Sequence, residues 1–113
     1  MKKFIFVLLF LTFCGSILTL GIRGNYGSPR AEELNDSLWK DSGPLELSPD
    51  RGRFSLTYSI VEDNSVYFSL PIARFATPDL GYENGRYVSL FAPGVSFIIA
   101  PGYVLGKVLG ISQ

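Results

Sequence analysis

The 113-residue chain contains no histidine, a single cysteine and no net charge, and each of these absences excludes a class of function. Without histidine there is no Ser-His-Asp or Cys-His catalytic arrangement and no histidine metal site. A single cysteine cannot form a disulfide within one chain, and Cys14 lies in an apolar run where a thiol is usually inert. The basic residues are not clustered, so no nucleic-acid partner is expected.

Two long apolar runs are present, one near each end. The first extends from Phe4 to Ile22 after Lys2 and Lys3, and as a helix it would be about 28 Å long, close to the roughly 30 Å of a bilayer core. The second follows Ala92-Pro93-Gly94 and continues to Gly110. The pattern predicts transmembrane helices at 1–22 and 89–110, the first an uncleaved anchor. A cleaved secretory signal peptide is the alternative for the first run.

Charge is segregated between these runs and the middle of the chain. All ten acidic residues lie between Glu32 and Glu83, whereas Lys2, Lys3 and Lys107 are the only charges in the apolar ends. The positive-inside rule then predicts an integral protein of the inner membrane, surrounded by lipid, with both termini cytoplasmic. The expected fold is a mainly α membrane protein in which an extracytoplasmic loop, 23–88, joins two transmembrane helices, with a truncated tail at 111–113.

The loop divides into three parts by composition. Residues 23–49 are rich in turn formers and predict irregular chain with one short helix, where Trp39 is an interfacial anchor. Residues 50–62 are ambiguous, because alternating apolar residues predict a strand while Phe54, Tyr58 and Val61 also share a helical face. Periodicity alone favours the strand. The remaining part predicts extended segments with a tight turn at Glu83-Asn84-Gly85-Arg86.

Five short motifs follow one another between residues 48 and 94. They are Ser48-Pro49-Asp50-Arg51-Gly52-Arg53-Phe54, Ser59-Ile60-Val61-Glu62-Asp63, Thr77-Pro78-Asp79, Asn84-Gly85-Arg86-Tyr87-Val88-Ser89 and Ala92-Pro93-Gly94. Together they resemble the opening of polytopic GT-C glycosyltransferases of the protein-mannosyl and aminoarabinose transferase kind, which take sugars from polyprenyl-phosphate donors. The resemblance implies a juxtamembrane helix at about 50–62 in place of a strand.

The resemblance also implies site residues. Asp50 falls on the family's catalytic carboxylate, which takes the acceptor's proton as the acceptor attacks the anomeric carbon. Arg53 and Arg51 would bind or orient the donor phosphate. A divalent metal cofactor is possible in the family. However, Arg51 occupies the position at which family members more often have Glu, so the motif of two adjacent acids is broken. No metal ligand is therefore assigned. A helix N-cap after Pro49 is the alternative role of Asp50.

Length limits the functional prediction. Two spans and a loop cannot enclose a polyprenyl-phosphate donor, so we expect the N-terminal membrane segment of a glycosyltransferase-like protein, inactive alone. One alternative is a small two-span membrane protein that binds a partner through its outer loop, and another is a secreted, signal-cleaved β-rich domain. In either membrane reading, Gly102 and Gly106 offer a small-residue face to a partner helix.

Overall fold

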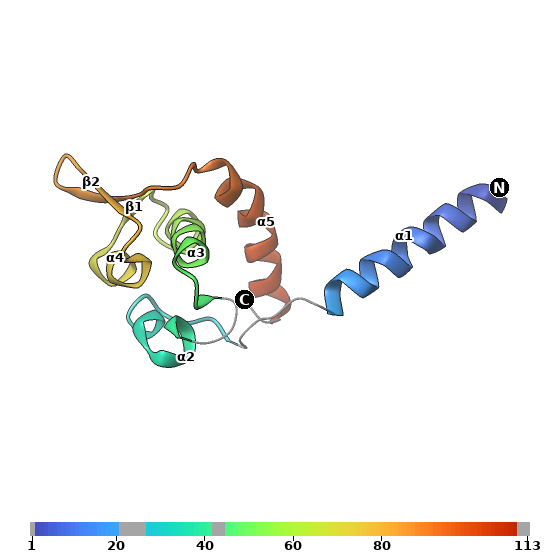
Figure 1. Ribbon diagram of the computed structural model, residues 1–113, viewed down its shortest axis with the longest axis horizontal. Coiled ribbons are helices and arrows are strands. Elements are labelled where there is room, and N and C mark those ends of the chain that lie inside the picture. Colours follow the sequence, from blue (N-terminus) through green and yellow to red (C-terminus); the bar gives the residue numbers. More distant parts are fainter. Residues whose placement is uncertain (1, 21–26, 42–44, 111–113) are drawn as a thin grey trace.

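The computed structural model describes residues 2–20, 27–41 and 45–110 (Figure 1). This part of the chain contains five α-helices, one 3₁₀-helix and three short strands. In chain order they are α1 (Lys2–Leu20), η1 (Glu33–Asn35), α2 (Ser37–Lys40), α3 (Ser48–Val61), β1 (Tyr67–Phe68), α4 (Leu70–Ala76), β2 (Leu80–Glu83), β3 (Arg86–Ser89) and α5 (Gly94–Leu109). Helix α1 leads away from the body that the other elements form (Figure 1).

The predicted pair of membrane-spanning helices is wrong. In the described part of the chain, no helix combines the length and the apolar character that a membrane crossing requires. The apolar part of α1 ends at Leu20 and is about 26 Å long, and the 16 residues of α5 reach about 24 Å, both short of a hydrocarbon core of roughly 30 Å. The second helix also carries Lys107, which forms an ion pair with Glu62.

The fold class and the location inferred from these spans are corrected with them. The predicted mainly α membrane fold, the inner-membrane location and the topology with both termini cytoplasmic are therefore wrong as well, because all three depended on the two spans. Residues 21 and 22 of the predicted first span, and the predicted tail at 111–113, lie outside the described residues.

Helix α3 lies at the centre of the body and covers most of the segment that was ambiguous between strand and helix. Pro49 stands in its first turn, where the missing backbone N–H has no partner to lose. Its small polar residues Ser55, Thr57 and Ser59 are buried together with Leu56 and Tyr58, so the helix is enclosed on several sides. Because neighbouring elements bury α3 on several sides, its sequence shows neither the alternation of a strand nor the single apolar face of a surface helix.

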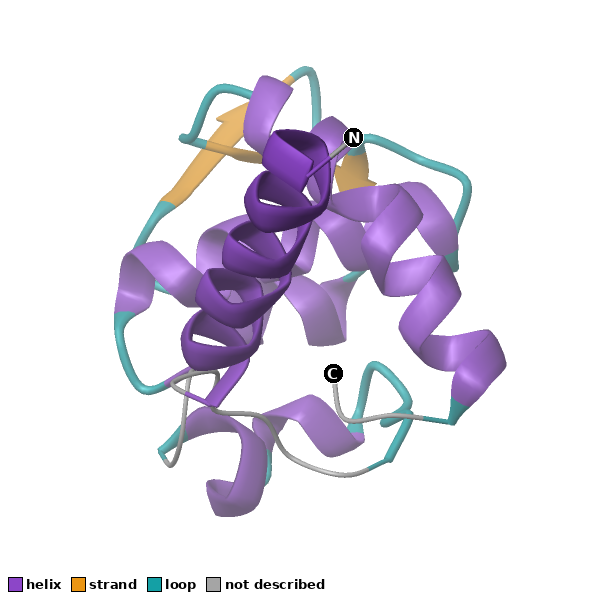
Figure 2. Cartoon of the chain, turned by 90° about the vertical axis from the view of Figure 1, so that its right-hand side faces the viewer, coloured by secondary structure: helices purple, strands orange, loops and turns teal. Residues whose placement is uncertain are grey.

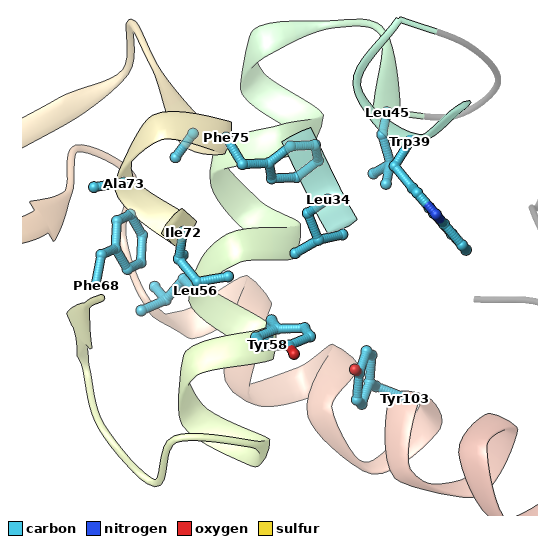
Figure 3. Close-up of a cluster of buried hydrophobic side chains, with 11 residues drawn as sticks. Leu34, Trp39, Leu45, Leu56, Tyr58, Phe68, Ile72, Ala73, Phe75 and Tyr103 are labelled. Atoms are coloured by element: carbon cyan, nitrogen blue, oxygen red, sulfur yellow. The ribbon is translucent and has the colours of Figure 1, made fainter. Parts of the chain in front are cut away.

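Side chains from six elements, α3 among them, and one loop residue form the core (Figure 3). Leu34, Ile72 and Phe75 are fully buried, and each such side chain contributes about 1.5–3 kcal/mol of hydrophobic stabilisation. Trp39 is 93% removed from solvent and lies in the same cluster with Leu45, so the predicted interfacial anchor is wrong. Trp39 and Leu45 are therefore held by the core rather than by a membrane surface.

The three strands form an antiparallel sheet in the order β1-β3-β2, grouped at one end of the body (Figure 2). Strands β2 and β3 form a hairpin with Glu83 opposite Arg86, as the turn residues predict. Asn84 and Gly85 close it with φ of 49° and 81°, and consecutive positive φ values are the signature of the turn that matches strand twist. This hairpin leads the chain from the core into α5.

Helix α5 packs beside α3 through polar contacts as well as apolar ones. Ser96 is buried and its Oγ donates to the backbone carbonyl of Arg53 at 3.1 Å. One turn from the other end of α5, Lys107 pairs with Glu62, whose Oε1 also accepts a hydrogen bond from the Tyr103 hydroxyl at 3.2 Å. The two helices therefore run side by side in the same direction, fixed at both ends.

Candidate functional site

Asp50 and Arg53 lie in the first turns of α3, one helical turn apart. The N-cap position is occupied by Leu47, and Asp50 is inside the first turn, where its backbone N–H donates to the Leu47 carbonyl at 3.1 Å. An acidic residue there interacts favourably with the helix dipole whether or not it has a chemical role. Asp50 is therefore a carboxylate of the first turn and not the N-cap of the helix.

The carboxylate and the guanidinium form a loose, accessible ion pair. Asp50 Oδ1 is 3.9 Å from Arg53 Nη1, and the two side chains are 44% and 45% exposed. The Arg53 guanidinium also lies over the Phe91 ring, 5.3 Å from its centroid. A guanidinium has five N–H donors, so these contacts leave donors for a ligand.

Gly52 makes this arrangement possible. A Cβ at this position would lie 2.6 Å from the Phe91 ring, closer than atoms of the two residues can approach. The missing side chain lets Phe91 lie against the α3 backbone directly beneath the neighbouring Arg53. The sequence reasoning missed this contact, although a glycine inside a helical segment is itself a signal of close packing.

Arg51, the other predicted phosphate ligand, points into the protein's own backbone. Its Nη1 donates to the carbonyls of Lys40 at 3.2 Å and Glu46 at 2.8 Å, and its Nη2 donates to the Thr77 carbonyl at 3.5 Å. These acceptors belong to α2, to the loop before α3 and to the end of α4. Arg51 thus joins three segments, whereas Arg53, two residues further and so near the opposite side of the helix, is partly exposed.

Asp50 and Arg53 border a groove between α3 and α5 with a volume of about 370 Å³. Its walls are mainly apolar and aromatic, and its lining residues are Leu45, Asp50, Arg53, Phe54, Thr57, Val95, Ile99 and Tyr103. The Thr57 hydroxyl donates to the Arg53 carbonyl at 3.0 Å, so it is committed to the helix. The charged groups of the groove are therefore gathered at one end, where α3 begins.

Phe54 and Tyr103, which line the groove, belong to an aromatic cluster. Phe54 contacts Tyr58, Phe75 and Tyr103 with ring centroids 6.0–6.2 Å apart, edge to face or tilted. Burial, reinforced by the charge of Glu62, raises the pKa of Tyr103 far above its ordinary value of 10.0. Tyr103 therefore remains a neutral phenol that donates to Glu62. Its ring lies beside that of Tyr58 (Figure 3).

Other acidic residues do not extend the site. The pKa of Asp63 is raised by burial and then by the neighbouring charge of Glu62. Asp79 accepts a hydrogen bond from the Ser48 hydroxyl and so connects the start of α3 to the chain after α4. Among residues 2–20, 27–41 and 45–110, no group of three or more acidic, cysteine or histidine side chains is arranged to hold a metal ion.

A scan against protein-family models, a search of curated proteins and a search of solved structures each found no match to this chain. The resemblance to GT-C glycosyltransferases therefore rests on the quoted motifs alone and stays a prediction.

Proposed function

We propose that the groove between α3 and α5 binds the phosphate end of a polyprenyl-phosphate sugar, and that the chain is the first segment of a glycosyltransferase-like protein. The observation that carries the proposal is that Asp50 and Arg53 border one end of an otherwise apolar groove of about 370 Å³. Small-molecule sites typically measure about 300–1,000 Å³ and combine apolar walls with few polar groups. This volume suits the phosphate and the first isoprene units of such a donor.

The two charged residues have different roles in this proposal. Arg53 would bind the donor phosphate through charge-assisted hydrogen bonds and stabilise it as it leaves. Asp50 would take the proton of the acceptor hydroxyl as its oxygen attacks the anomeric carbon. Their separation of 3.9 Å keeps both groups within reach of one bound phosphosugar.

Transfer by this chain alone is not expected. Nearly half of each charged side chain remains exposed, so water has access to the reacting groups. Closing the site and excluding water would require further elements of a longer protein. Binding of a partner through residues 23–88, the alternative function, also stays a prediction.

Binding of farnesyl phosphate, measured by isothermal titration calorimetry, tests the proposal. We expect the natural chain to bind farnesyl phosphate more tightly than farnesol or inorganic phosphate, since only the first satisfies both parts of the groove. Arg53→Gln should weaken binding at least about tenfold, because a hydrogen bond to a charged group is lost. Asp50→Asn should not weaken it, since the carboxylate is assigned to proton transfer.

Arg74→Gln is the matched control, because Arg74 is an exposed arginine on α4, away from the groove. It should bind farnesyl phosphate like the natural chain. Equal affinity of the natural chain and Arg53→Gln would remove Arg53 from the site and the proposed donor with it.

A further inference from the structure

Beside its contact with α3, helix α5 carries an apolar groove without a charged residue. It has a volume of about 540 Å³ and is lined by Phe97, Ala100, Pro101, Val104, Leu105 and Val108. Val108 and Leu105 are 77% and 58% exposed. None of these residues lines the groove that holds Asp50 and Arg53, so the two surfaces are separate.

Helix α1 presents the second uncovered apolar surface. Large apolar side chains on all its sides are more than half exposed, from Phe4 at 72% to Leu20 at 86%. In a single copy of the chain, α1 extends away from the body that contains α5 (Figure 1). Its 19 residues correspond to about 28 Å and the 16 residues of α5 to about 24 Å, so the two helices match within about one turn.

The solvent-accessible area of the chain shows how much surface a partner could cover. It is 7856 Å², whereas a folded monomer of 12.5 kDa is expected to expose only about 6,200 Å². The excess is about 1,700 Å², and a standard interface covers about 800 Å² on each partner. The excess therefore corresponds to two standard contact areas per chain.

A second copy of the chain supplies two such areas. We propose that α1 of each copy packs along the α5 groove of the other, so that a reciprocal two-fold dimer covers the α5 groove and one side of α1 in both copies. A two-fold arrangement closes on itself, so the same contact is made twice and does not propagate into a filament. This assignment does not depend on the ligand proposed for the groove between α3 and α5.

The natural Cys14 in α1 allows a direct test by disulfide cross-linking. One cysteine is introduced at Phe97, Val104 or Val108 in turn, because these positions sample the length of the α5 groove. Under mild oxidation of the full chain, we expect at least one of the three to give a covalent dimer beyond the background of the natural chain. Glu83→Cys, on the β2–β3 hairpin, is the control and should stay at background.

Two cross-linking results would overturn the proposal. A disulfide closed within single chains would show that α1 covers the α5 groove of its own copy. No cross-link above background at any of the three positions would show that α1 does not occupy the groove.

Sedimentation equilibrium with a matched pair of variants tests the dimer independently. Leu105→Glu places a charge in the α5 groove, and Leu70→Glu places the same charge at a similarly exposed position, 53% against 58%, on α4. We expect Leu105→Glu to raise the dimer dissociation constant at least about tenfold and Leu70→Glu to leave it nearly unchanged. A natural chain that is monomeric throughout the micromolar range, or equal effects of the two variants, would contradict the proposed interface.

Discussion

At Gly52, the absence of a side chain decides how closely α3 approaches Phe91. Alanine is the better helix former by about 1 kcal/mol, but its Cβ would lie 2.6 Å from the Phe91 ring. Overpacking of this kind typically costs about 1–3 kcal/mol. After the gain in helix propensity is subtracted, we expect Gly52→Ala to lower the free energy of unfolding, measured in urea, by up to about 2 kcal/mol.

Gly106→Ala provides the comparison for this prediction. Gly106 is also helical, but a Cβ there meets nothing within 4 Å, so alanine should stabilise the chain by up to about 1 kcal/mol. A Gly52→Ala variant as stable as Gly106→Ala would show that Phe91 moves aside without cost.

Part of the candidate site follows from residue spacing. Once 50–62 is taken as a helix, Asp50 and Arg53 must lie one turn apart and on the same side, which the observed pair satisfies. The contacts of Arg51 could not be predicted in this way. Its three acceptor carbonyls come from segments as distant as Lys40 and Thr77, and only the tertiary fold brings them together.

At the scale of elements, the contact between α3 and α5 depends on Tyr103 remaining protonated. Its folded-state pKa is raised above the ordinary value of 10.0, first by burial and then by Glu62. The raised pKa contributes stability that is fully present below pH 10.0 and is lost as the pH rises further, because only the unfolded chain then releases the proton. The slope is at most about 1.4 kcal/mol per pH unit.

Tyr103→Phe tests this dependence. Its unfolding free energy in urea should fall less steeply than that of the natural chain between pH 10 and 11, by up to about 1.4 kcal/mol per pH unit. Tyr82→Phe, at a tyrosine that is 70% exposed on the hairpin, should retain the natural slope. Identical slopes for all three proteins would rule out Tyr103 as the responsible group.

Sequence patterns predicted the β2–β3 hairpin correctly, but the prediction of extended chain after residue 62 is wrong at Leu70–Ala76, which form α4. The hairpin turn depends on Asn84 and Gly85 themselves, so its chemistry is readable from two residues. The period of α3 is obscured because Ser55, Thr57 and Ser59 are buried beside its apolar residues. In α5, Ser96 and Tyr103 face α3 while most of the remaining side chains are apolar, so the run has the hydropathy of a span without being one.

At the scale of the whole molecule, the membrane prediction failed because hydropathy measures how apolar a segment is and not what covers it. Helix α1 is apolar on every side, and an apolar helix reads the same whether lipid or protein is its neighbour. Only the length of each helix could then distinguish a span from a shorter apolar helix. Both runs form helices a few ångströms shorter than a bilayer core. The ion pair between Lys107 and Glu62 was equally hidden, since 45 residues separate its members.

The contacts that join α5 to α3 also determine the order in which the protein assembles. The β2–β3 hairpin closes over two residues and can form within about 1–10 μs, whereas Ser96 must reach Arg53 across 43 residues and Lys107 must reach Glu62 across 45. Contacts of such long sequence separation form late, and in the monomer, where the apolar side of α5 is uncovered, this helix opens at low free energy. Amide hydrogen exchange should therefore show α5 exchanging at a lower free energy than residues 56–59 of α3, and equal protection would contradict this order. The groove between the two helices would then be the last part of the molecule to close during folding and the first to reopen.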